Sequence, residues 1–159
     1  MSIGIIGGSG IYEALPLEDV EKRSVTTPFG EPSDDLTVGQ LHGKDVVFLP
    51  RHGPDHQHTP TNAPYKANVY ALKDAGVDRV ISTNAVGSLR EDLPPRSLLV
   101  PDQIFDRTSQ REHTFFGDGM VVHMGFADPY DPALKSHLAD AAESADHDAD
   151  VEEDGTYVC

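Results

Sequence analysis

The sequence contains no tryptophan and a single cysteine, Cys159, which is the last of its 159 residues. A lone cysteine excludes an intramolecular disulfide framework and a metal or thiol site built from cysteines. No apolar run approaches the ~20 residues that a membrane-spanning helix needs. The N-terminal stretch MSIGIIGGSG also lacks the basic region and the long apolar region of a secretory signal peptide. We therefore expect a cytoplasmic protein.

Positive charge is scarce as well, because 12 Lys and Arg residues stand against 27 Asp and Glu residues, for a formal net charge of -15. Such a chain repels nucleic acids and anionic lipids, so neither is an expected partner. An anionic substrate must then meet positive charge that is concentrated locally. The acidity has two interpretations, a functional acidic surface or adaptation to a high-salt cytoplasm. We favour the second, a halophilic protein, because the acidic residues are scattered along the whole chain.

The length fits one domain or part of one. Short apolar runs predict buried strands at residues 2–6, 46–49 and 78–83, and weaker patterns predict strands at 20–26 and 36–41. Apolar residues at helical spacing predict a helix of about three turns that begins near Tyr65 and ends at Gly76. The strand, helix, strand order predicts a parallel pair of strands, and therefore an α/β layered fold.

The second half of the chain has a less regular pattern. Residues 98–104 predict a strand that Pro101 interrupts, because proline cannot donate a backbone hydrogen bond. The alanine-rich stretch 132–145 predicts an amphipathic helix. Residues 149–159 predict a turn and the start of another strand.

Polar residues follow three of the predicted strands, at the point where each strand ends. Residues 7–10 (GGSG) offer backbone N–H groups and a hydroxyl to an anion, although a plain tight turn explains the glycines equally well. Arg51 and His52 come next, and the guanidinium fork matches a phosphate; the alternative is a surface arginine paired with a carboxylate. Asn84 and Ala85 offer amide donors. Because ligands gather beyond the carboxyl ends of such strands, we predict a phosphate or oxyanion site there.

Three histidines, His52, His56 and His58, lie close together in the sequence. They are separated by four and then two residues in a proline-containing loop, and no fourth ligand is obvious. This spacing is weak support for a metal. We therefore predict no metal site.

Several sequence blocks follow one another in a recognisable order. They are GIIGGSGIY, LPRHGPDHQHTP, YKANVYALKDAGVDRVISTNAVGSLRED and PDQIFDRT, followed by His123 and by ADPY at residues 127–130. Together they resemble the methylthioadenosine phosphorylase branch of the trimeric purine nucleoside phosphorylase family, over nearly the whole chain. The resemblance implies an α/β fold, with a central mixed β-sheet flanked by helices, in subunits that form homotrimers or hexamers.

The resemblance also implies a reaction. Inorganic phosphate displaces the purine from C1′ of a nucleoside, of the 5′-methylthioadenosine, methylthioinosine, inosine or guanosine type, in purine salvage. The products are free purine and an α-pentose 1-phosphate. No cofactor is implied, since phosphate is a co-substrate. The implied partners are therefore a purine nucleoside, phosphate and further copies of the chain.

Seven positions of this sequence match binding residues of the family. Those implied to bind phosphate are Ser9, Arg51, His52, Asn84 and Ala85. His56 matches a histidine near the ribose, and His123 matches one that reaches across a subunit interface toward the 5′ end of the sugar. These two transfers are weaker than the first five.

Family members continue beyond the equivalent of residues 157–159, into segments that hold the purine pocket and the acid that assists at purine N7. The resemblance therefore implies that residues 1–159 are the N-terminal part of a single nucleoside phosphorylase domain, incomplete at the C-terminus. Its catalytic residue is unknown, and we expect little or no activity at this length. The alternative function is a non-catalytic phosphate- or nucleotide-binding remnant. Purine and 5′ preferences depend on the later segments.

Overall fold

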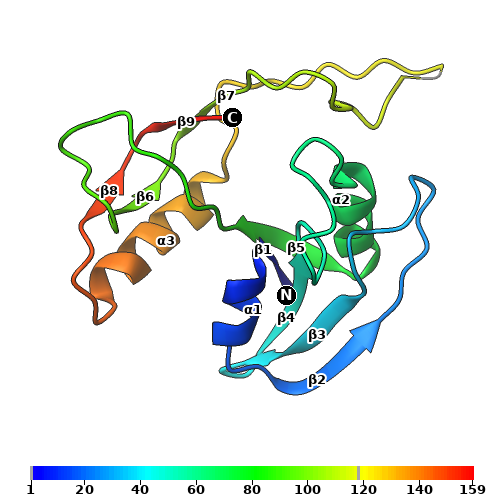
Figure 1. Cartoon of the computed structure of the whole chain (residues 1–159), viewed down its shortest axis with the longest axis horizontal. Coiled ribbons are helices and arrows are strands. Elements are labelled where there is room, and N and C mark those ends of the chain that lie inside the picture. The colour runs from blue at the N-terminus through cyan, green and yellow to red at the C-terminus, as the bar shows by residue number, and fades with distance from the viewer. Residues whose placement is uncertain (1, 118) are drawn as a thin grey trace. The chain divides into compact units, whose positions relative to one another are not determined.

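The computed structural model describes residues 2–117 and 119–159, apart from the side chains of Ser9 and Tyr12. The chain divides into two compact units. The first contains residues up to Ala85 together with Gln110–Phe115, and the second contains Val86–Ser109 and Phe116–Cys159. Figure 1 shows the elements of both units along the chain.

The first unit is built on a mixed sheet of five strands in the order β2-β3-β4-β1-β5. β1 runs parallel to β4 and to β5, whereas β3 is antiparallel to both β2 and β4. Its elements are β1 (Ser2–Gly7), α1 (Ser9–Ala14), β2 (Glu18–Arg23), β3 (Leu36–Leu41), β4 (Lys44–Pro50), α2 (Tyr65–Asp74) and β5 (Val77–Ser82). The predicted α/β fold with a mixed central sheet is therefore confirmed.

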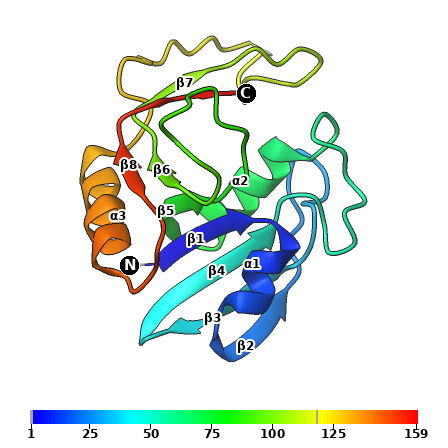
Figure 2. The same cartoon turned by 60° about the vertical axis from the view of Figure 1, so that its left-hand side comes forward.

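Two helices lie on opposite faces of this sheet (Figure 2). A Cβ added to Gly4 of β1 would lie 2.9 Å from Val77 and 3.4 Å from Leu72 of α2, whereas one added to Gly7 would lie 3.4 Å from Ile11 of α1. Alternate side chains along the chain in a strand point to opposite faces, so positions 4 and 7 face opposite ways. Glycine at both positions lets the neighbouring elements approach the sheet closely.

The apolar core lies between α2 and the sheet. Leu36, Val47, Leu49 and Leu72 belong to one buried cluster, which also contains Ala71 and Val77. α2 buries Ala67, Asn68, Ala71 and Leu72, which recur at helical spacing. The buried run from 46 to 49 is the stretch that the sequence predicts as a strand, and the tight turn His42-Gly43, with φ values of 49° and 73°, connects it to β3.

Three details differ from the sequence prediction. The strand predicted as buried at residues 78–83 is an edge strand, β5, in which only Val77 is buried and the other residues alternate between exposed and half-buried. β4 and β5 are parallel, but they do not pair with each other, because β1 lies between them. Local sequence order cannot show this, since the third strand of the group comes from the N-terminus. The glycine-rich segment after β1 is also not a simple turn, because a short helix begins at Ser9.

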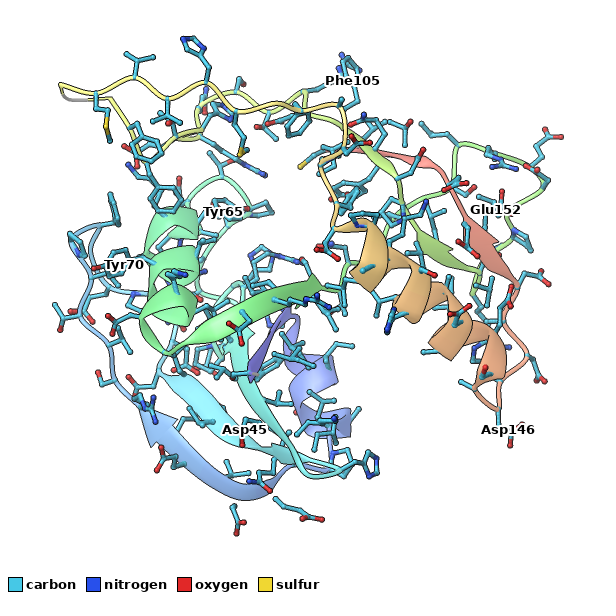
Figure 3. The ribbon with its side chains drawn as sticks, turned by 180° about the vertical axis from the view of Figure 1, so that it is seen from behind. Asp45, Tyr65, Tyr70, Phe105, Asp146 and Glu152 are labelled. Atoms are coloured by element: carbon cyan, nitrogen blue, oxygen red, sulfur yellow. The ribbon has the colours of Figure 1, made fainter. Side chains whose placement is uncertain are left out.

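Aromatic and charged contacts hold Gln110–Phe115 within the first unit. The ring of Phe29 meets the rings of Tyr70 and Phe115 edge-on, at centroid distances of 5.7 and 5.1 Å. Lys66 lies 5.2 Å from the centroid of the same ring and pairs with Glu112 at 2.7 Å. Tyr70 belongs to α2, and Figure 3 shows it beside this helix.

The second unit contains two small parallel strand pairs, β6 with β8 and β7 with β9. Its elements are β6 (Leu98–Val100), β7 (Gln103–Phe105), α3 (Pro132–Ser144), β8 (Val151–Glu153) and β9 (Thr156–Val158). The predicted strand 98–104 is interrupted as expected, because β6 and β7 lie on either side of Pro101 and pair with different strands. α3 begins with Asp131 as its N-cap, whose carboxylate accepts a hydrogen bond of 2.7 Å from the Leu134 amide.

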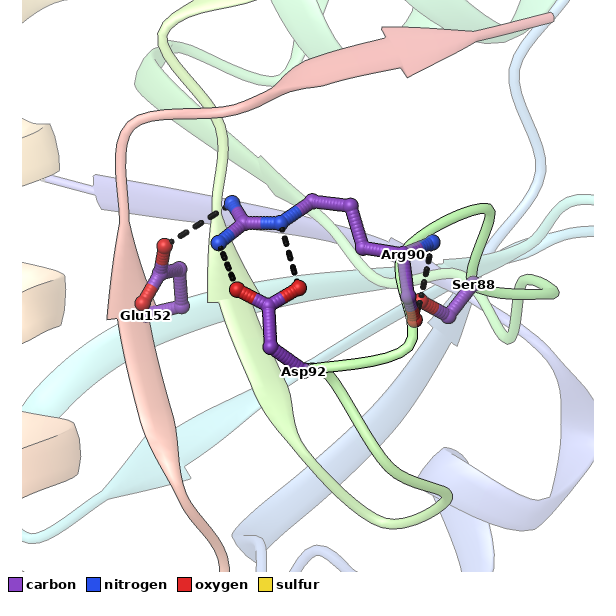
Figure 4. A network of polar contacts seen from close by, with 4 residues as sticks. All are labelled: Ser88, Arg90, Asp92 and Glu152. Atoms are coloured by element: carbon purple, nitrogen blue, oxygen red, sulfur yellow. Dashed lines mark hydrogen bonds and ion pairs between the residues drawn. The ribbon is translucent and has the colours of Figure 1, made fainter.

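An ion-pair network joins the loop before β6 to β8 (Figure 4). Arg90 donates to Asp92 at 3.0 and 2.5 Å and to Glu152 at 3.0 Å, and its backbone N–H donates to the hydroxyl of Ser88 at 3.1 Å. The hydrogen bond from Arg90 lowers the pKa of the Asp92 carboxyl below its ordinary value. Because Arg90 and Asp92 are exposed, their ion pair contributes little to the stability of the unit.

None of the helices in the described part of the chain has the length and apolar character needed to cross a bilayer.

Candidate anion-binding site

The carboxyl ends of three strands meet at one edge of the five-stranded sheet. Gly7 of β1 pairs with Pro50 of β4, and Ile6 of β1 pairs with Ser82 of β5. The backbone hydrogen bonding to β1 continues for one residue beyond the end of β4 and of β5. The Arg51 amide donates to the Gly7 carbonyl at 2.9 Å, and the Thr83 amide donates to the Ile6 carbonyl at 3.0 Å. The three polar segments that the sequence singles out therefore all leave the sheet at the same edge.

Arg51 and Asn84 are in direct contact there. Nη1 of Arg51 donates to the backbone carbonyl of Thr83 at 3.3 Å and to the side-chain oxygen of Asn84. Among the described residues no carboxylate pairs with Arg51, so the alternative of a surface arginine neutralised by an acidic neighbour does not hold. All its partners are neutral, and its positive charge therefore stays available to an anion.

His52 is held on both sides of its ring. Nδ1 lies 2.9 Å from the carbonyl oxygen of His58, and Nε2 lies 3.2 Å from Nε of Arg51. A carbonyl oxygen can only accept and Nε of arginine can only donate, so Nδ1 carries the hydrogen and Nε2 accepts. The His58 amide also donates to the His52 carbonyl at 3.1 Å, so a backbone hydrogen bond joins the two ends of this loop.

The loop between His52 and His58 contains two residues with positive φ. Gly53 has φ of 80°, and a Cβ at this position would lie 2.8 Å from the side chain of Gln57. His56 has φ of 53°, a conformation that is uncommon for a residue other than glycine. Its ring stacks on the ring of His52, with centroids 6.4 Å apart and planes at 12°. The loop therefore places a second imidazole beside the first, and this strained position makes His56 a candidate binding residue.

The other predicted residues are placed as follows. Ser9 begins α1, directly after the β1 end, but its side chain lies outside the described part of the structure. Ala85 is exposed and follows Asn84 in the chain. His123 is exposed and belongs to the second unit. Within the described residues, no group of three His, Cys, Asp or Glu side chains could hold a metal ion.

One group at the site has no counterpart in the sequence prediction. The hydroxyl of Thr83 is buried without a hydrogen-bond partner among the described residues. A Cβ at Gly7 would lie 2.8 Å from this oxygen, so the close approach of β1 and the segment after β5 requires glycine. A buried hydroxyl without a partner is unusual, because leaving it unsatisfied costs about 1–3 kcal/mol. The sequence could not indicate this buried hydroxyl, since threonine is common in strands.

Comparison with known proteins agrees with this geometry. The family model of the phosphorylase superfamily matches residues 2–159. The chain belongs to the phosphorylase superfamily. An S-methyl-5'-thioadenosine phosphorylase from Thermosynechococcus vestitus is 52% identical over 158 residues, which are 99% of this chain and 55% of the relative. One from Geobacter sulfurreducens is 50% identical, over 99% of this chain and 54% of the relative.

Solved structures of the superfamily are similar to this chain as well. A methylthioadenosine phosphorylase from an antarctic soil metagenomic library has a TM-score of 0.95 and 48% identity, over 99% of this chain and 55% of that one. A methylthioadenosine phosphorylase from Schistosoma mansoni in complex with adenine has a TM-score of 0.89 and 38% identity, over 99% of this chain and 64% of that one. This phosphorylase-superfamily chain thus spans about half the length of the curated relatives that it matches.

The contacts of His52 predict its tautomer. At a pH where the ring is neutral, we expect ¹⁵N NMR to show a protonated Nδ1 and an unprotonated Nε2, because the His58 carbonyl can only accept. His42, an exposed histidine in the turn between β3 and β4, is an internal comparison in the same spectrum. A protonated Nε2 on neutral His52 would contradict the assignment and the hydrogen bond from Arg51.

Proposed function

We propose that this chain provides the phosphate site of an enzyme that cleaves 5′-methylthioadenosine with inorganic phosphate. The observation that carries the proposal is Arg51, which has only neutral partners at the meeting point of three strand ends. The similar proteins named S-methyl-5'-thioadenosine phosphorylase support the same reaction. Adenine and 5-methylthioribose 1-phosphate are then the products, and the enzyme acts in purine salvage without a cofactor beyond phosphate.

In this reaction, a phosphate oxygen forms a bond to C1′ while the bond between C1′ and N9 breaks. The bonding electrons leave with the purine, which takes up a proton at N7. The transition state has oxocarbenium character, so a phosphate dianion held below C1′ both attacks the sugar and stabilises its developing positive charge. The residues that hold the phosphate therefore contribute to the rate as well as to binding.

Each site residue then has a specific task. Arg51 supplies the positive charge, and Asn84, whose amide oxygen already accepts from Arg51, can turn its NH₂ group to phosphate. Ser9 adds a hydroxyl and Ala85 a backbone amide. His52 accepts from Arg51 through Nε2, so it orients the guanidinium while it is neutral, and it donates to phosphate only if it takes up a proton.

The nucleoside side of the site is less completely assigned. We propose His56 as a ribose contact, because its ring stacks on His52 beside the strand ends. We propose His123 as a contact to the 5′ end of the sugar, supplied to a neighbouring copy of the chain. No carboxylate forms a hydrogen bond or ion pair with Arg51, His52 or Asn84 among the described residues. The acid that protonates N7 is therefore assigned to no residue here.

Phosphate binding and nucleoside cleavage test this proposal separately. Titration calorimetry of the chain with phosphate should show binding, and Arg51→Gln should weaken it about 10- to 100-fold, because a hydrogen bond to a charged group is lost. Arg23→Gln is the matched control, since Arg23 lies on the exposed strand β2 and pairs with Glu21 at 3.1 Å.

The cleavage assay follows adenine released from methylthioadenosine, with and without phosphate. Phosphate-dependent release that Arg51→Gln abolishes supports the enzyme. Phosphate binding without release is the outcome that an incomplete phosphorylase domain predicts, and the alternative, a phosphate-binding remnant, predicts it as well. No phosphate binding by the wild-type chain would contradict both.

We also propose that the chain functions as a homo-oligomer, a trimer or hexamer. Residues 119–130 contain no helix or strand, yet they expose several large apolar side chains. Met124 is 81% exposed and Val121 is 77% exposed, and Met120 and Phe126 are both more than half exposed. A further copy of the chain is the occupant that we propose for this segment, because apolar residues gathered on an exposed segment mark interaction sites.

The oligomer proposal can be tested by analytical ultracentrifugation. The wild-type chain should sediment above the monomer mass of 17.2 kDa. The double variant Val121→Ser, Met124→Ser should shift the distribution toward monomer, because it removes apolar contact area. Leu89→Ser is the matched control, since Leu89 is 91% exposed but lies outside the segment. A wild-type chain that is monomeric at all concentrations would contradict the proposal.

A halophilic origin is a further proposal, together with the cytoplasmic location that the sequence predicts. Exposed carboxylates such as Asp45 and Asp146 come from separate parts of the chain (Figure 3). With a net charge of -15, mutual repulsion destabilises the folded state, and salt screens it. We expect the melting temperature to rise steeply between 0.1 and about 2 M KCl. A melting temperature that is unchanged over this range would contradict salt adaptation.

A further inference from the structure

The peptide group between Pro50 and Arg51 is held by three hydrogen bonds. Its carbonyl oxygen accepts from the Ser33 hydroxyl at 2.7 Å and from the Gly53 amide at 3.1 Å. Its N–H donates to the Gly7 carbonyl at 2.9 Å. This plane sets the direction in which the chain leaves β4, and therefore where the Arg51 side chain begins. Two of the three bonds come from the sheet edge and the site loop, but the third comes from a distant segment.

Ser33 in turn is attached to α2. Its backbone N–H donates to the side-chain oxygen of Asn68 at 2.8 Å. Ser33 and Asn68 thus form a bridge from α2 to the Pro50 carbonyl. Ser33 is 3% exposed and Asn68 is 2% exposed, so this bridge lies in the interior of the first unit. A continuous path of buried hydrogen bonds thus runs from α2, through Ser33, to the peptide that carries Arg51.

Burial makes this bridge directional. A buried carbonyl or amide that loses its partner pays the full cost of desolvation, because water cannot replace the bond. The Pro50 carbonyl has a second donor in the Gly53 amide, and it meets both donors only in the orientation in which Ser33 donates to it. An apolar contact at the same place would allow small rotations of the peptide, because apolar contacts have little directional preference. The consequence reaches Arg51, whose Nε and Nη1 contact His52 and Asn84.

We propose that Ser33 and Asn68 are positioning residues for the anion site: they orient the Pro50–Arg51 peptide so that Arg51 meets His52 and Asn84. Neither residue lies at a strand end of the site, and their hydrogen bonds here are to each other and to the Pro50 carbonyl. The identity of the anion as phosphate rests on the proposed function, but the geometric role of the bridge does not.

Ser33→Ala removes the hydroxyl with little change in volume and is the first variant to test. Thr37→Val is its matched control. The Thr37 hydroxyl is also buried, on β3 of the same sheet, and has no hydrogen-bond partner among the described residues. Both variants remove one buried hydroxyl, but only Ser33→Ala removes a bond to the site peptide. Ser33→Thr retains the hydroxyl and is the rescue variant.

Three quantities are measured for each variant: the melting temperature, the dissociation constant for inorganic phosphate, and the ¹⁵N shifts of the His52 ring. We expect Ser33→Ala to weaken phosphate binding about tenfold, because one hydrogen bond to a buried group is lost. We also expect the ¹⁵N shift of His52 Nε2 to change, because Arg51 donates to that nitrogen, whereas Nδ1 keeps its hydrogen against the His58 carbonyl. Thr37→Val should leave the phosphate dissociation constant and the His52 shifts unchanged. Ser33→Thr should restore the wild-type values of these two quantities. If Ser33→Ala does not fold, Ser33→Cys is the second variant, because it keeps a side chain of similar volume with a weaker hydrogen-bond donor. It should change the phosphate dissociation constant and the His52 shifts in the same direction as Ser33→Ala.

The outcomes separate this inference from the proposed function. A variant that melts earlier but keeps the phosphate affinity and the His52 shifts of the wild type would show a merely structural role and overturn the inference. A wild-type chain that does not bind phosphate would overturn the proposed function. In that case the His52 shifts alone decide the inference: a changed Nε2 shift in Ser33→Ala supports it, and an unchanged Nε2 shift overturns it.

Discussion

The pairing of β1 with β4 on one side and with β5 on the other determines where every polar group of the site lies. β1 pairs with both strands, and its last residues, Ile6 and Gly7, accept hydrogen bonds from the segments that follow β5 and β4. Arg51 and Asn84 are 33 positions apart in sequence, yet they come into contact because each follows a strand bound to β1. The geometry of the site is therefore a property of the sheet rather than of any one loop.

Close packing around β1 makes this arrangement possible. Gly4 leaves room for Leu72 and Val77, and Gly7 leaves room for the hydroxyl of Thr83. A larger residue at either position would move the sheet away from α2 or separate the segment after β5 from β1. The short run SIGII followed by glycine is thus a central strand with a helix on each face of the sheet, in which Gly4 and Gly7 are buried and the other residues are half-buried.

Electrostatics determines which ligand this edge can accept. The net charge of -15 repels anions at long range, but salt screens that repulsion beyond about 10 Å at 0.1 M. At short range, Arg51 dominates, because its partners are a carbonyl, an amide oxygen and a neutral ring nitrogen. A carboxylate in the place of Asn84 would cancel the charge. The neutral amide orients the guanidinium and leaves its positive charge attractive to an anion. The buried bridge through Ser33 orients the peptide group that precedes the same arginine.

The sequence by itself determined the α/β class, the positions of most strands and helices, and the three polar segments, because hydrophobic periodicity and residue chemistry are local properties. It also indicated the superfamily, through blocks whose order and spacing are specific. Tertiary structure alone decided that β1 lies between β4 and β5, that Arg51 contacts Asn84, and that His58 selects the tautomer of His52. The same holds for Ser33 and Asn68, which in the sequence are ordinary polar residues of a loop and a helix. Their importance comes from hydrogen bonds between residues 17 and 35 positions apart, and no local pattern encodes such contacts.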